Sequence, residues 1–441
     1  MNKKIFSFIT SVFIFLFISN LFTLNVFAQP DKIAEKLREA AANLQNNQFD
    51  EAEKILRNVL KTAPSNADAH NLLGIVLDQK GNFAEAEREY RQALKTNPKA
   101  VSPLANLGVL LAKNKRNDEA IKTFEAVLQL RPDHPQATIN IGILYSSNGN
   151  YQKAVPYLKK ATEFQPDSFD IVYNLGLALY QTGKADEAEA YFINAAELSP
   201  NSAETFYWLG MIAFDKKNDE LAGDYFEKSL ALKPDHAPSN FMLGEIFAKY
   251  QNYAEAKKYY ETALKYDASQ AVYHIRLGGM YIFLGEFRQA LKIFEDASAK
   301  FPKISEIQYF LAVVQRGLGD SQAAVTALQK TLALKPNDAD AHTLLGAIKL
   351  DRGEFAEAEK LLRTAISLSK NNFNALNDLG RLLVKTKRYG DALGYLKQAA
   401  ALNPQNADVH YQMFLSYSNL KQKTEADREL AIFKELSNPK K

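Results

Sequence analysis

The sequence predicts an all-α protein, a right-handed α-solenoid of about twelve helix-turn-helix units, because the same residues return every 34 positions. Such a period is typical of solenoids, in which stacked repeats share one continuous core. The first recurring series consists of glycines, at Gly74, Gly108, Gly142, Gly176, Gly210, Gly244, Gly278, Gly346 and Gly380. The second consists of alanines, at Ala52, Ala86, Ala120, Ala154, Ala188, Ala222, Ala256, Ala290, Ala324, Ala358, Ala392 and Ala426. The third consists of prolines, at Pro64, Pro98, Pro132, Pro166, Pro200, Pro234, Pro302, Pro336 and Pro404.

The first half of each unit predicts an amphipathic helix that ends at a left-handed residue. In the unit that begins at residue 169, the apolar or small positions are Val172, Leu175, Gly176 and Leu179. Their i, i+3, i+4, i+7 spacing is that of one helix face. Gly183 follows, and glycine takes the left-handed conformation at little steric cost. The other units carry Asn47, Gly81, Lys115, Gly149, Lys217, Gln251, Gly285, Gly319, Gly353, Lys387 and Lys421 at this position.

The second half of each unit predicts another helix, which packs against the first. Ala188, Phe192 and Ala195 lie on its apolar stripe. Pro200 ends it, because the residue before a proline avoids the helical conformation. We expect Gly176 to face Ala188, so that the two helices approach closely. One hairpin cannot bury its own apolar face, and only neighbouring units complete the core.

This arrangement resembles the tetratricopeptide repeat, a family of 34-residue helix-turn-helix units. The glycine, alanine and proline series carry the resemblance, in register across twelve units. The units begin near residues 33, 67, 101, 135, 169, 203, 237, 271, 305, 339, 373 and 407. They form one solenoid over residues 29–441. The resemblance implies that the first helices line a concave wall that binds proteins or peptides.

Residues 1–28 differ in composition from the repeats. Lys3 and Lys4 precede a long apolar run, and the residues before Gln29 fit a small-x-small cleavage site. This layout predicts a secretory signal peptide, whose cleavage leaves a secreted or periplasmic chain. The alternative is an uncleaved N-terminal helix that anchors the chain, because residues 5–28 are long enough to span a bilayer. In either case we expect the repeats to lie outside the cytoplasm.

The composition argues against several classes of protein. The chain has no cysteine, so neither a disulfide framework nor a lipid-modified cysteine is expected. It has 54 Lys and Arg residues against 51 Asp and Glu residues, a formal net charge of +3. This balance gives no basic stripe for nucleic acid. The charges alternate along helix surfaces, which is typical of solvent-exposed faces.

Neither an enzyme active site nor a metal site is expected. Four of the six histidines, namely His70, His274, His342 and His410, stand at position 4 of different repeats. Whole repeats therefore separate them, and they cannot bind one ion. The sequence has no HExxH, no phosphate-binding glycine loop and no GxSxG motif. Because repeats fill residues 33 to about 440, we expect no catalytic domain, no catalytic residues and no cofactor.

A row of asparagines marks the first helices of three consecutive repeats. Asn106, Asn140 and Asn174 stand at position 6 of these repeats. Stacking would turn them into a ladder of amides that binds an extended peptide backbone. At these three positions the row resembles the asparagine ladder in the superhelix of the O-linked N-acetylglucosamine transferase. The alternative is that each asparagine bonds only to its neighbours in the fold.

Aromatic residues continue the same predicted wall. They are Tyr173, Tyr180, Tyr207, Phe214, Phe241, Phe283 and Tyr309, with Trp208 nearby. Rings that face a groove are common binding anchors. We expect a peptide to lie along the third to ninth repeats, with amides at one end and rings in the middle. The alternative is that these rings pack helix against helix.

The sequence therefore predicts an exported, non-catalytic scaffold that binds proteins or peptides along its groove. The predicted setting is the assembly of an envelope complex, such as a secretion, pilus or polysaccharide-export machine. One alternative is a targeting subunit of a glycosyltransferase system. Another is a polysaccharide-binding solenoid that stacks sugars on Tyr173, Tyr207, Phe241 and Tyr309. No nucleic acid partner is expected, and membrane contact is expected only through an uncleaved N-terminal segment.

Overall fold

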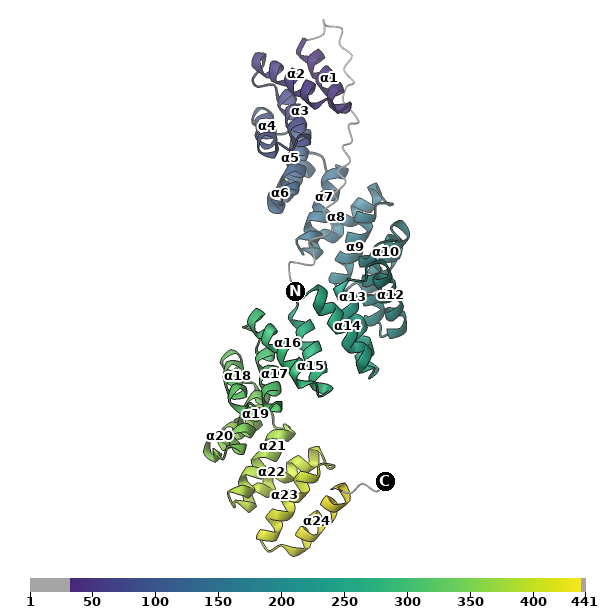
Figure 1. The fold of residues 1–441 in the computed structure, drawn as a ribbon. Helices are drawn as coiled ribbons and strands as arrows, with labels where there is room; N and C mark the ends of the chain where they lie inside the picture. The colour runs from purple at the N-terminus through teal and green to yellow at the C-terminus, as the bar shows by residue number, and fades with distance from the viewer. Residues whose placement is uncertain (1–31, 438–441) are drawn as a thin grey trace. The chain divides into compact units, whose positions relative to one another are not determined.

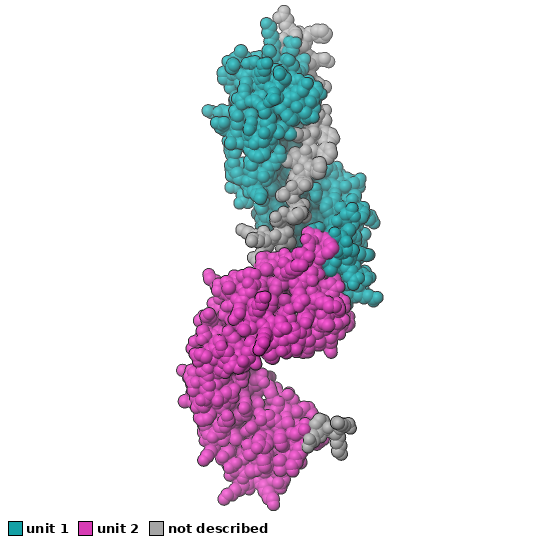
Figure 2. Space-filling model, viewed as in Figure 1, with its two compact units in different colours: residues 1–232 teal, residues 233–441 magenta. Residues whose placement is uncertain are grey.

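A computed structural model describes residues 32–437, which form 24 α-helices and no β-strand (Figure 1). This confirms the predicted all-α class. The chain divides into two compact units, residues 1–232 and residues 233–441, which we call the N-terminal unit and the C-terminal unit (Figure 2). The predicted signal peptide lies outside the described residues. Between residues 32 and 437, no helix combines the length and the apolar character that crossing a bilayer requires.

Consecutive helices pair as hairpins in both units, so each odd-numbered helix is the first helix of a repeat and the next is its second. The N-terminal unit contains α1 (Lys32–Gln45), α2 (Phe49–Thr62), α3 (Ala67–Gln79), α4 (Phe83–Thr96), α5 (Val101–Lys113), α6 (Asn117–Leu130), α7 (Pro135–Ser147), α8 (Tyr151–Phe164), α9 (Phe169–Gln181), α10 (Ala185–Leu198), α11 (Ala203–Asp215) and α12 (Asp219–Leu232). The C-terminal unit contains α13 (Ala237–Lys249), α14 (Tyr253–Tyr266), α15 (Ala271–Phe283), α16 (Phe287–Lys300), α17 (Ser305–Gly317), α18 (Ser321–Leu334), α19 (Ala339–Asp351), α20 (Phe355–Leu368), α21 (Phe373–Lys385), α22 (Tyr389–Leu402), α23 (Ala407–Asn419) and α24 (Lys423–Ser437).

The turn inside every hairpin contains a left-handed residue at the predicted position. Six of the twelve are glycines and six are not, with φ between 57° and 64° at the non-glycine residues Asn47, Lys115, Lys217, Gln251, Lys387 and Lys421. A side chain in this conformation costs roughly 1–2 kcal/mol per residue. Half of the hairpins are therefore closed by a strained turn.

Replacing Lys115 by glycine should stabilise the chain by about 1 kcal/mol, because glycine has no Cβ to clash at a φ of 60°. The midpoint of urea denaturation, followed by circular dichroism, should rise. Gly149→Ala is the converse control, since Gly149 occupies the next turn at a φ of 75° and should lower the midpoint. A Lys115→Gly midpoint at or below that of the unmodified chain would contradict strain at this turn.

The ends of the helices are set by local residues. Side chains such as Asn66 and Asp338 accept a hydrogen bond from a backbone N–H of the first helical turn, which satisfies a donor that the helix leaves free. Ala63, before Pro64, leaves the helical conformation with a φ of −135°. Asp267 has almost the same φ, −139°, although alanine follows it. The missing proline therefore does not change how this helix ends.

The recurring glycine of the first helix makes room for a large residue of the second helix. A Cβ built on Gly176 would lie 3.2 Å from the ring of Phe192, which supplies its three nearest atoms. The expected approach of Gly176 to Ala188 stays a prediction, because the nearest side chain at this position is that of Phe192. In the other repeats the glycine faces Tyr90, Phe124, Leu158, Phe226, Tyr260, Phe294, Leu362 or Leu396. A helix without a Cβ at this position lets a ring fill the interface at close-packed density.

The core of the N-terminal unit runs continuously through its repeats. Leu56, Tyr90, Phe124 and Phe192 belong to one cluster of buried residues and are at most 1% exposed. The C-terminal unit has its own clusters, which contain Phe294 and other buried side chains. Each hairpin thus buries its apolar face against the next one, as expected for stacked repeats.

Candidate functional site

The first helices of neighbouring repeats lie next to one another in the N-terminal unit. We call the surface of α3, α5, α7, α9 and α11 the first-helix wall. Hydrogen bonds link successive helices of this wall. Asn106 Nδ2 on α5 donates to Asn71 Oδ1 on α3 at 3.0 Å, and Trp208 Nε1 on α11 donates to the Tyr173 hydroxyl on α9 at 3.0 Å. Both bonds join position 6 of one repeat to position 5 of the preceding one.

The three predicted asparagines have three different environments. Asn106 is held by Asn71. Asn174 is 8% exposed, and its Nδ2 donates to the backbone carbonyl of Asp170 at 2.7 Å within the same helix. The Asn140 Nδ2 is buried and has no hydrogen-bond partner among the described residues. Two of the three amides thus bond inside the fold, and peptide binding by this row stays a prediction.

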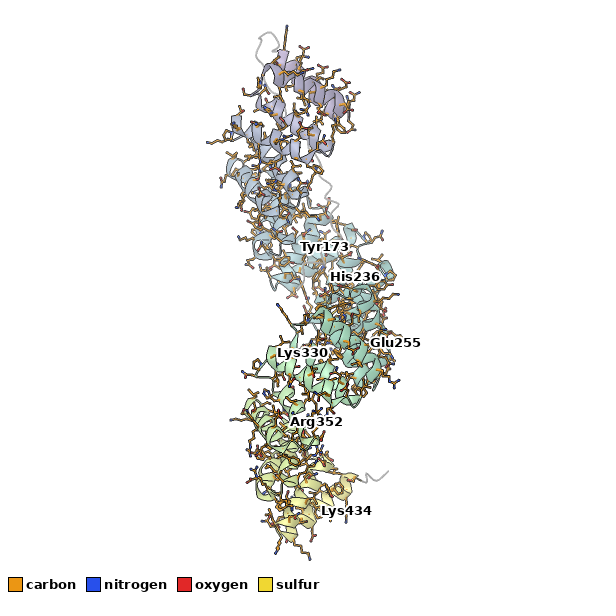
Figure 3. All side chains as sticks on the ribbon, turned by 60° about the vertical axis from the view of Figure 1, so that its left-hand side comes forward. Tyr173, His236, Glu255, Lys330, Arg352 and Lys434 are labelled. Atoms are coloured by element: carbon orange, nitrogen blue, oxygen red, sulfur yellow. The ribbon has the colours of Figure 1, made fainter. Side chains whose placement is uncertain are left out.

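Tyr173, which is labelled in Figure 3, is buried and is not an exposed anchor of the wall. It is 5% exposed, and its ring packs edge-on against Phe192 at a centroid distance of 5.8 Å. Burial raises the pKa of the Tyr173 hydroxyl. The expectation of an exposed ring fails here because position 5 of this repeat also faces the second helix of the same hairpin.

Other predicted rings lie half-buried on the wall. Tyr180, Tyr207 and Trp208 form a cluster that we call the aromatic platform. Trp208 lies 5.3 Å from Tyr180 and 5.0 Å from Tyr207, measured between ring centroids. Burial raises the pKa of Tyr207 to about 12, so its hydroxyl stays neutral at physiological pH. Phe214 is half-buried on α11, the helix that also carries Tyr207 and Trp208.

Carboxylates also lie on the helices of the aromatic platform, and no sequence motif marks them. Asp170 lies in the first turn of α9, Glu204 lies in the first turn of α11, and Asp215 ends α11. The Tyr180 hydroxyl donates to Asp215 Oδ2 at 2.7 Å. Partial burial raises the pKa of Asp170. Helices α7, α9 and α11 contain no Lys or Arg, so every charged side chain on them is acidic.

The first helices of the C-terminal unit carry the remaining predicted rings. Phe241 is half-buried and stacks on Tyr273 at 4.7 Å, so it packs in part between helices. Tyr309 is half-buried and meets Phe310 edge-on at 5.6 Å. Phe283 is the most exposed of the predicted rings, at 63%. The arginines of these helices have acidic partners, in the pairs Arg276–Glu245, Arg316–Asp351 and Arg381–Asp378.

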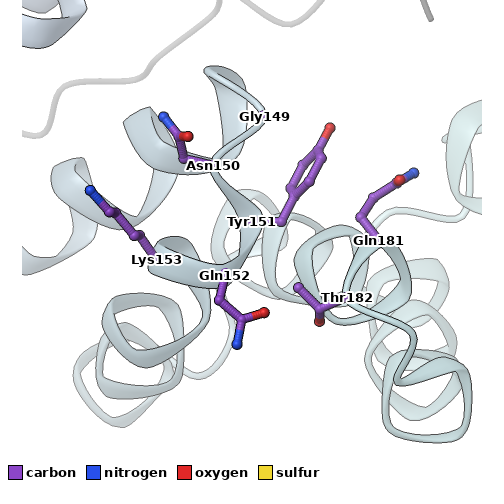
Figure 4. A pocket seen from close by; sticks show the side chains of 7 residues that line it. All are labelled: Gly149, Asn150, Tyr151, Gln152, Lys153, Gln181 and Thr182. Atoms are coloured by element: carbon purple, nitrogen blue, oxygen red, sulfur yellow. The ribbon is translucent and has the colours of Figure 1, made fainter.

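One open hollow of about 480 Å³ lies at the end of α7 and the start of α8. Figure 4 shows its lining side chains, which come from the turn at Gly149, the first residues of α8 and the end of α9. Tyr151, Lys153 and Gln181 are among them. The lining has no pair of groups placed for acid–base or nucleophilic chemistry.

The histidines at position 4 bond within their own part of the fold. His70 Nδ1 lies 2.5 Å from Glu89 Oε2, and its Nε2 lies 2.9 Å from the carbonyl oxygen of Pro64. His410 makes the equivalent two contacts in the last repeat. These histidines therefore link the proline turn to the second helix. In residues 32–437, no three His, Cys, Asp or Glu side chains are grouped so as to hold a metal ion.

Several solved structures match this chain in part. One is the Cut9–Hcn1 hetero-tetramer of the APC/C (16% identity, 88% of this chain and 96% of that chain, TM-score 0.45). Another is YrrB, a TPR protein with an unusual peptide-binding site. Its sequence identity is 22%, the match covers 42% of this chain and 95% of that chain, and the TM-score is 0.40. A third is MamA from Desulfovibrio magneticus RS-1. Its sequence identity is 24%, the match covers 38% of this chain and 96% of that chain, and the TM-score is 0.36. No curated protein sequence matches the chain.

Three families of known domains match the sequence and together extend from residue 34 to residue 437. Residues 217–437, half of the chain, match the C-terminal domain of cilia and flagella-associated protein 70. Residues 34–144 match the C-terminal ARM domain of tetratricopeptide repeat protein 21. Residues 139–203 and 173–237 match the tetratricopeptide repeat itself. With the 34-residue hairpins, these matches show that the chain belongs to the tetratricopeptide repeat family.

Proposed function

We propose that the chain is an exported, non-catalytic scaffold whose first-helix wall binds a segment of a partner protein during assembly of an envelope complex. The aromatic platform of Tyr180, Tyr207 and Trp208 carries this proposal. Half-buried Tyr and Trp rings provide apolar contact area together with a polar group, and they are common among the residues that dominate binding energy. Solenoid repeats generally bind partners along such extended surfaces.

The polar groups of the wall support binding in preference to catalysis. The Tyr180 hydroxyl is held by Asp215, and the Tyr173 hydroxyl is held by Trp208. Burial keeps the pKa of both hydroxyls above the ordinary value for tyrosine. Such groups stay protonated at neutral pH and make poor bases. Export is supported by Lys3 and Lys4 followed by an apolar run, as in a signal peptide.

Cross-linking in intact cells tests the proposal. Cells that naturally make the chain are treated with a cross-linker that does not pass the cytoplasmic membrane, and adducts of the tagged chain are identified by mass spectrometry. We expect a small set of envelope proteins. Tyr207→Ala should reduce their capture about tenfold, the loss that follows when one central binding ring is removed.

Tyr225→Ala is the matched control, because Tyr225 is also half-buried but lies on α12, the second helix of the same repeat. Its capture of partners should match that of the unmodified chain. Equal losses for both variants, with equal losses of thermal stability, would show that Tyr207 serves packing alone. Absence of any adduct would contradict export, and capture of glycans in place of proteins would favour a polysaccharide-binding solenoid.

A further inference from the structure

The hairpin of α23 and α24 contains a histidine whose two ring nitrogens both contact hydrogen-bond acceptors. From these contacts we infer that α24 docks on α23 in a pH-dependent manner: it stays docked while His410 and Glu429 share an extra proton, and it opens as the pH rises. Opening would expose part of the buried cluster that joins Ala426 of α24 to Met413 and Tyr417 of α23. The pair lies in the C-terminal unit, so the pH dependence does not rely on binding by the first-helix wall.

The His410 ring has an acceptor at each nitrogen. Nδ1 lies 2.6 Å from Glu429 Oε2, and Nε2 lies 3.0 Å from the backbone carbonyl oxygen of Pro404. A carbonyl oxygen can only accept a hydrogen bond, so Nε2 must carry a proton. The contact at Nδ1 also needs a proton, which is carried either by Nδ1 or by the carboxyl group. In both cases the pair holds one proton more than a neutral histidine beside an ionised glutamate.

The fold offers the glutamate no other source of compensation. His410 is 7% exposed and Glu429 is 8% exposed. Glu429 pairs with no Lys or Arg among residues 32–437, so His410 is its one described ionic partner. Loss of the shared proton would leave a buried carboxylate without a compensating charge, which is strongly unfavourable. Opening of α24 removes this cost because it returns Glu429 to water.

The other ionisable groups of the helices packed around His410 do not contact this pair. The charged residues are Asp378, Arg381 and Lys385 on α21, Asp391 and Lys397 on α22, Asp408 on α23, and Lys423, Glu425, Asp427, Arg428, Lys434 and Glu435 on α24. All are exposed except Asp378 and Arg381, which pair with each other at 2.9 Å. The tyrosines of α22 and α23 are phenols, a group that ionises only near about pH 10. The state of the His410–Glu429 pair therefore sets the pH dependence of this hairpin.

Helix α24 is held by less apolar burial than the other second helices. Its buried residues are Ala426 and Glu429, and its larger apolar side chains are at most half-buried. His70 and Glu89 make the same kind of pair between α3 and α4, but there the second helix also buries the ring of Tyr90. Loss of a proton should therefore open α24 more readily than α4.

The dependence on pH has a definite sign. A freely exposed histidine loses its proton near about pH 6.5. Above that pH the docked form binds one proton more than the open form, so docking weakens by up to about tenfold per pH unit. Between about pH 5 and pH 6 both forms hold the proton, and docking should vary little.

Hydrogen exchange of the full chain, measured by mass spectrometry at about pH 6 and about pH 8.5, tests this pH dependence. The quantity compared is the protection factor, in which the effect of pH on the exchange chemistry has been divided out. We expect protection of α24 to fall by about tenfold or more between the two conditions, while that of α22 stays constant. Glu429→Gln and His410→Gln should each abolish the fall, because neither leaves a pair that can share the proton.

His342→Gln is the matched control and should keep the fall in α24. His342 stands at the same position of its repeat, but its ring has a single described contact, at 2.8 Å from the carbonyl oxygen of Asp338. Equal protection of α24 at both pH values in the unmodified chain would overturn the pH-dependent docking, whether or not the variants fold. An equal fall in α22, or a fall that persists in Glu429→Gln and His410→Gln, would overturn the role of this pair.

Discussion

Phe294→Ala is expected to lower the free energy of unfolding of the C-terminal unit by about 3–5 kcal/mol, the usual cost of emptying a core site that held a phenylalanine. Phe294 on α16 is 0% exposed, and its ring fills the space that Gly278 leaves open on α15. It also stacks on Phe310 at 5.5 Å, so it joins one repeat to the next. The loss should appear as a lower urea midpoint and as faster amide hydrogen exchange in α15 and α16.

Phe283→Ala provides the matched control, since Phe283 ends the first helix of the same repeat and is 63% exposed. Its only described ring contact is with Tyr253, at 4.4 Å. The expected loss is below about 1 kcal/mol, as for most substitutions outside a core. Similar midpoints for the two variants would mean that the second-helix ring is not the central packing element of a repeat.

The 34-residue period was sufficient to predict the helices, their pairing and the turns between them. The turn at Lys115 shows why: its position in the repeat, and not its residue type, predicted a left-handed backbone. The contact of Gly176 with Phe192 could not be predicted in the same way. Two apolar stripes show which faces meet, but which residues oppose each other depends on how the helices cross.

The residues of the predicted wall lie on first helices, as the period predicts, but their contacts with one another did not follow from the period. A ladder at one repeat position assumes that equivalent residues of successive repeats meet. In the structure Asn106 bonds to Asn71, and Trp208 bonds to Tyr173, so position 6 meets position 5 of the preceding repeat. The 34-residue period does not predict this shift by one position, because the shift arises from the way neighbouring first helices pack.

The total charge of the chain does not indicate the acidic side chains of α9 and α11. Asp170 and Glu204 are two of 51 acidic residues, which nearly balance the basic ones. Sorting charges by helix shows the signal, since three successive first helices lack Lys and Arg. This information was present in the sequence. Its significance depends on the structure, which brings the rings of Tyr180, Tyr207 and Trp208 together on the same helices.

Gly278→Ala and Gly279→Ala should change stability in opposite directions, although the two glycines are adjacent in α15. A Cβ on Gly278 would lie 2.4 Å from Cζ of Phe294, whose ring is enclosed by the core and cannot move aside freely. We expect a loss of about 1–3 kcal/mol from this overpacking. A Cβ on Gly279 would meet nothing within 4 Å, so alanine should there stabilise the helix by about 0.5–1 kcal/mol.

Urea denaturation of the two single variants measures this difference, and Gly176→Ala extends it. The Cβ at Gly176 would lie 3.2 Å from the Phe192 ring, so a smaller loss than at Gly278 is expected. Stabilisation by both neighbouring substitutions would mean that helix propensity outweighs the contact with the ring. The recurring glycine would then reflect backbone flexibility. If Gly278→Ala lowers stability and Gly279→Ala raises it, the glycine that recurs every 34 residues is required because a buried side chain of the second helix occupies the space of its Cβ.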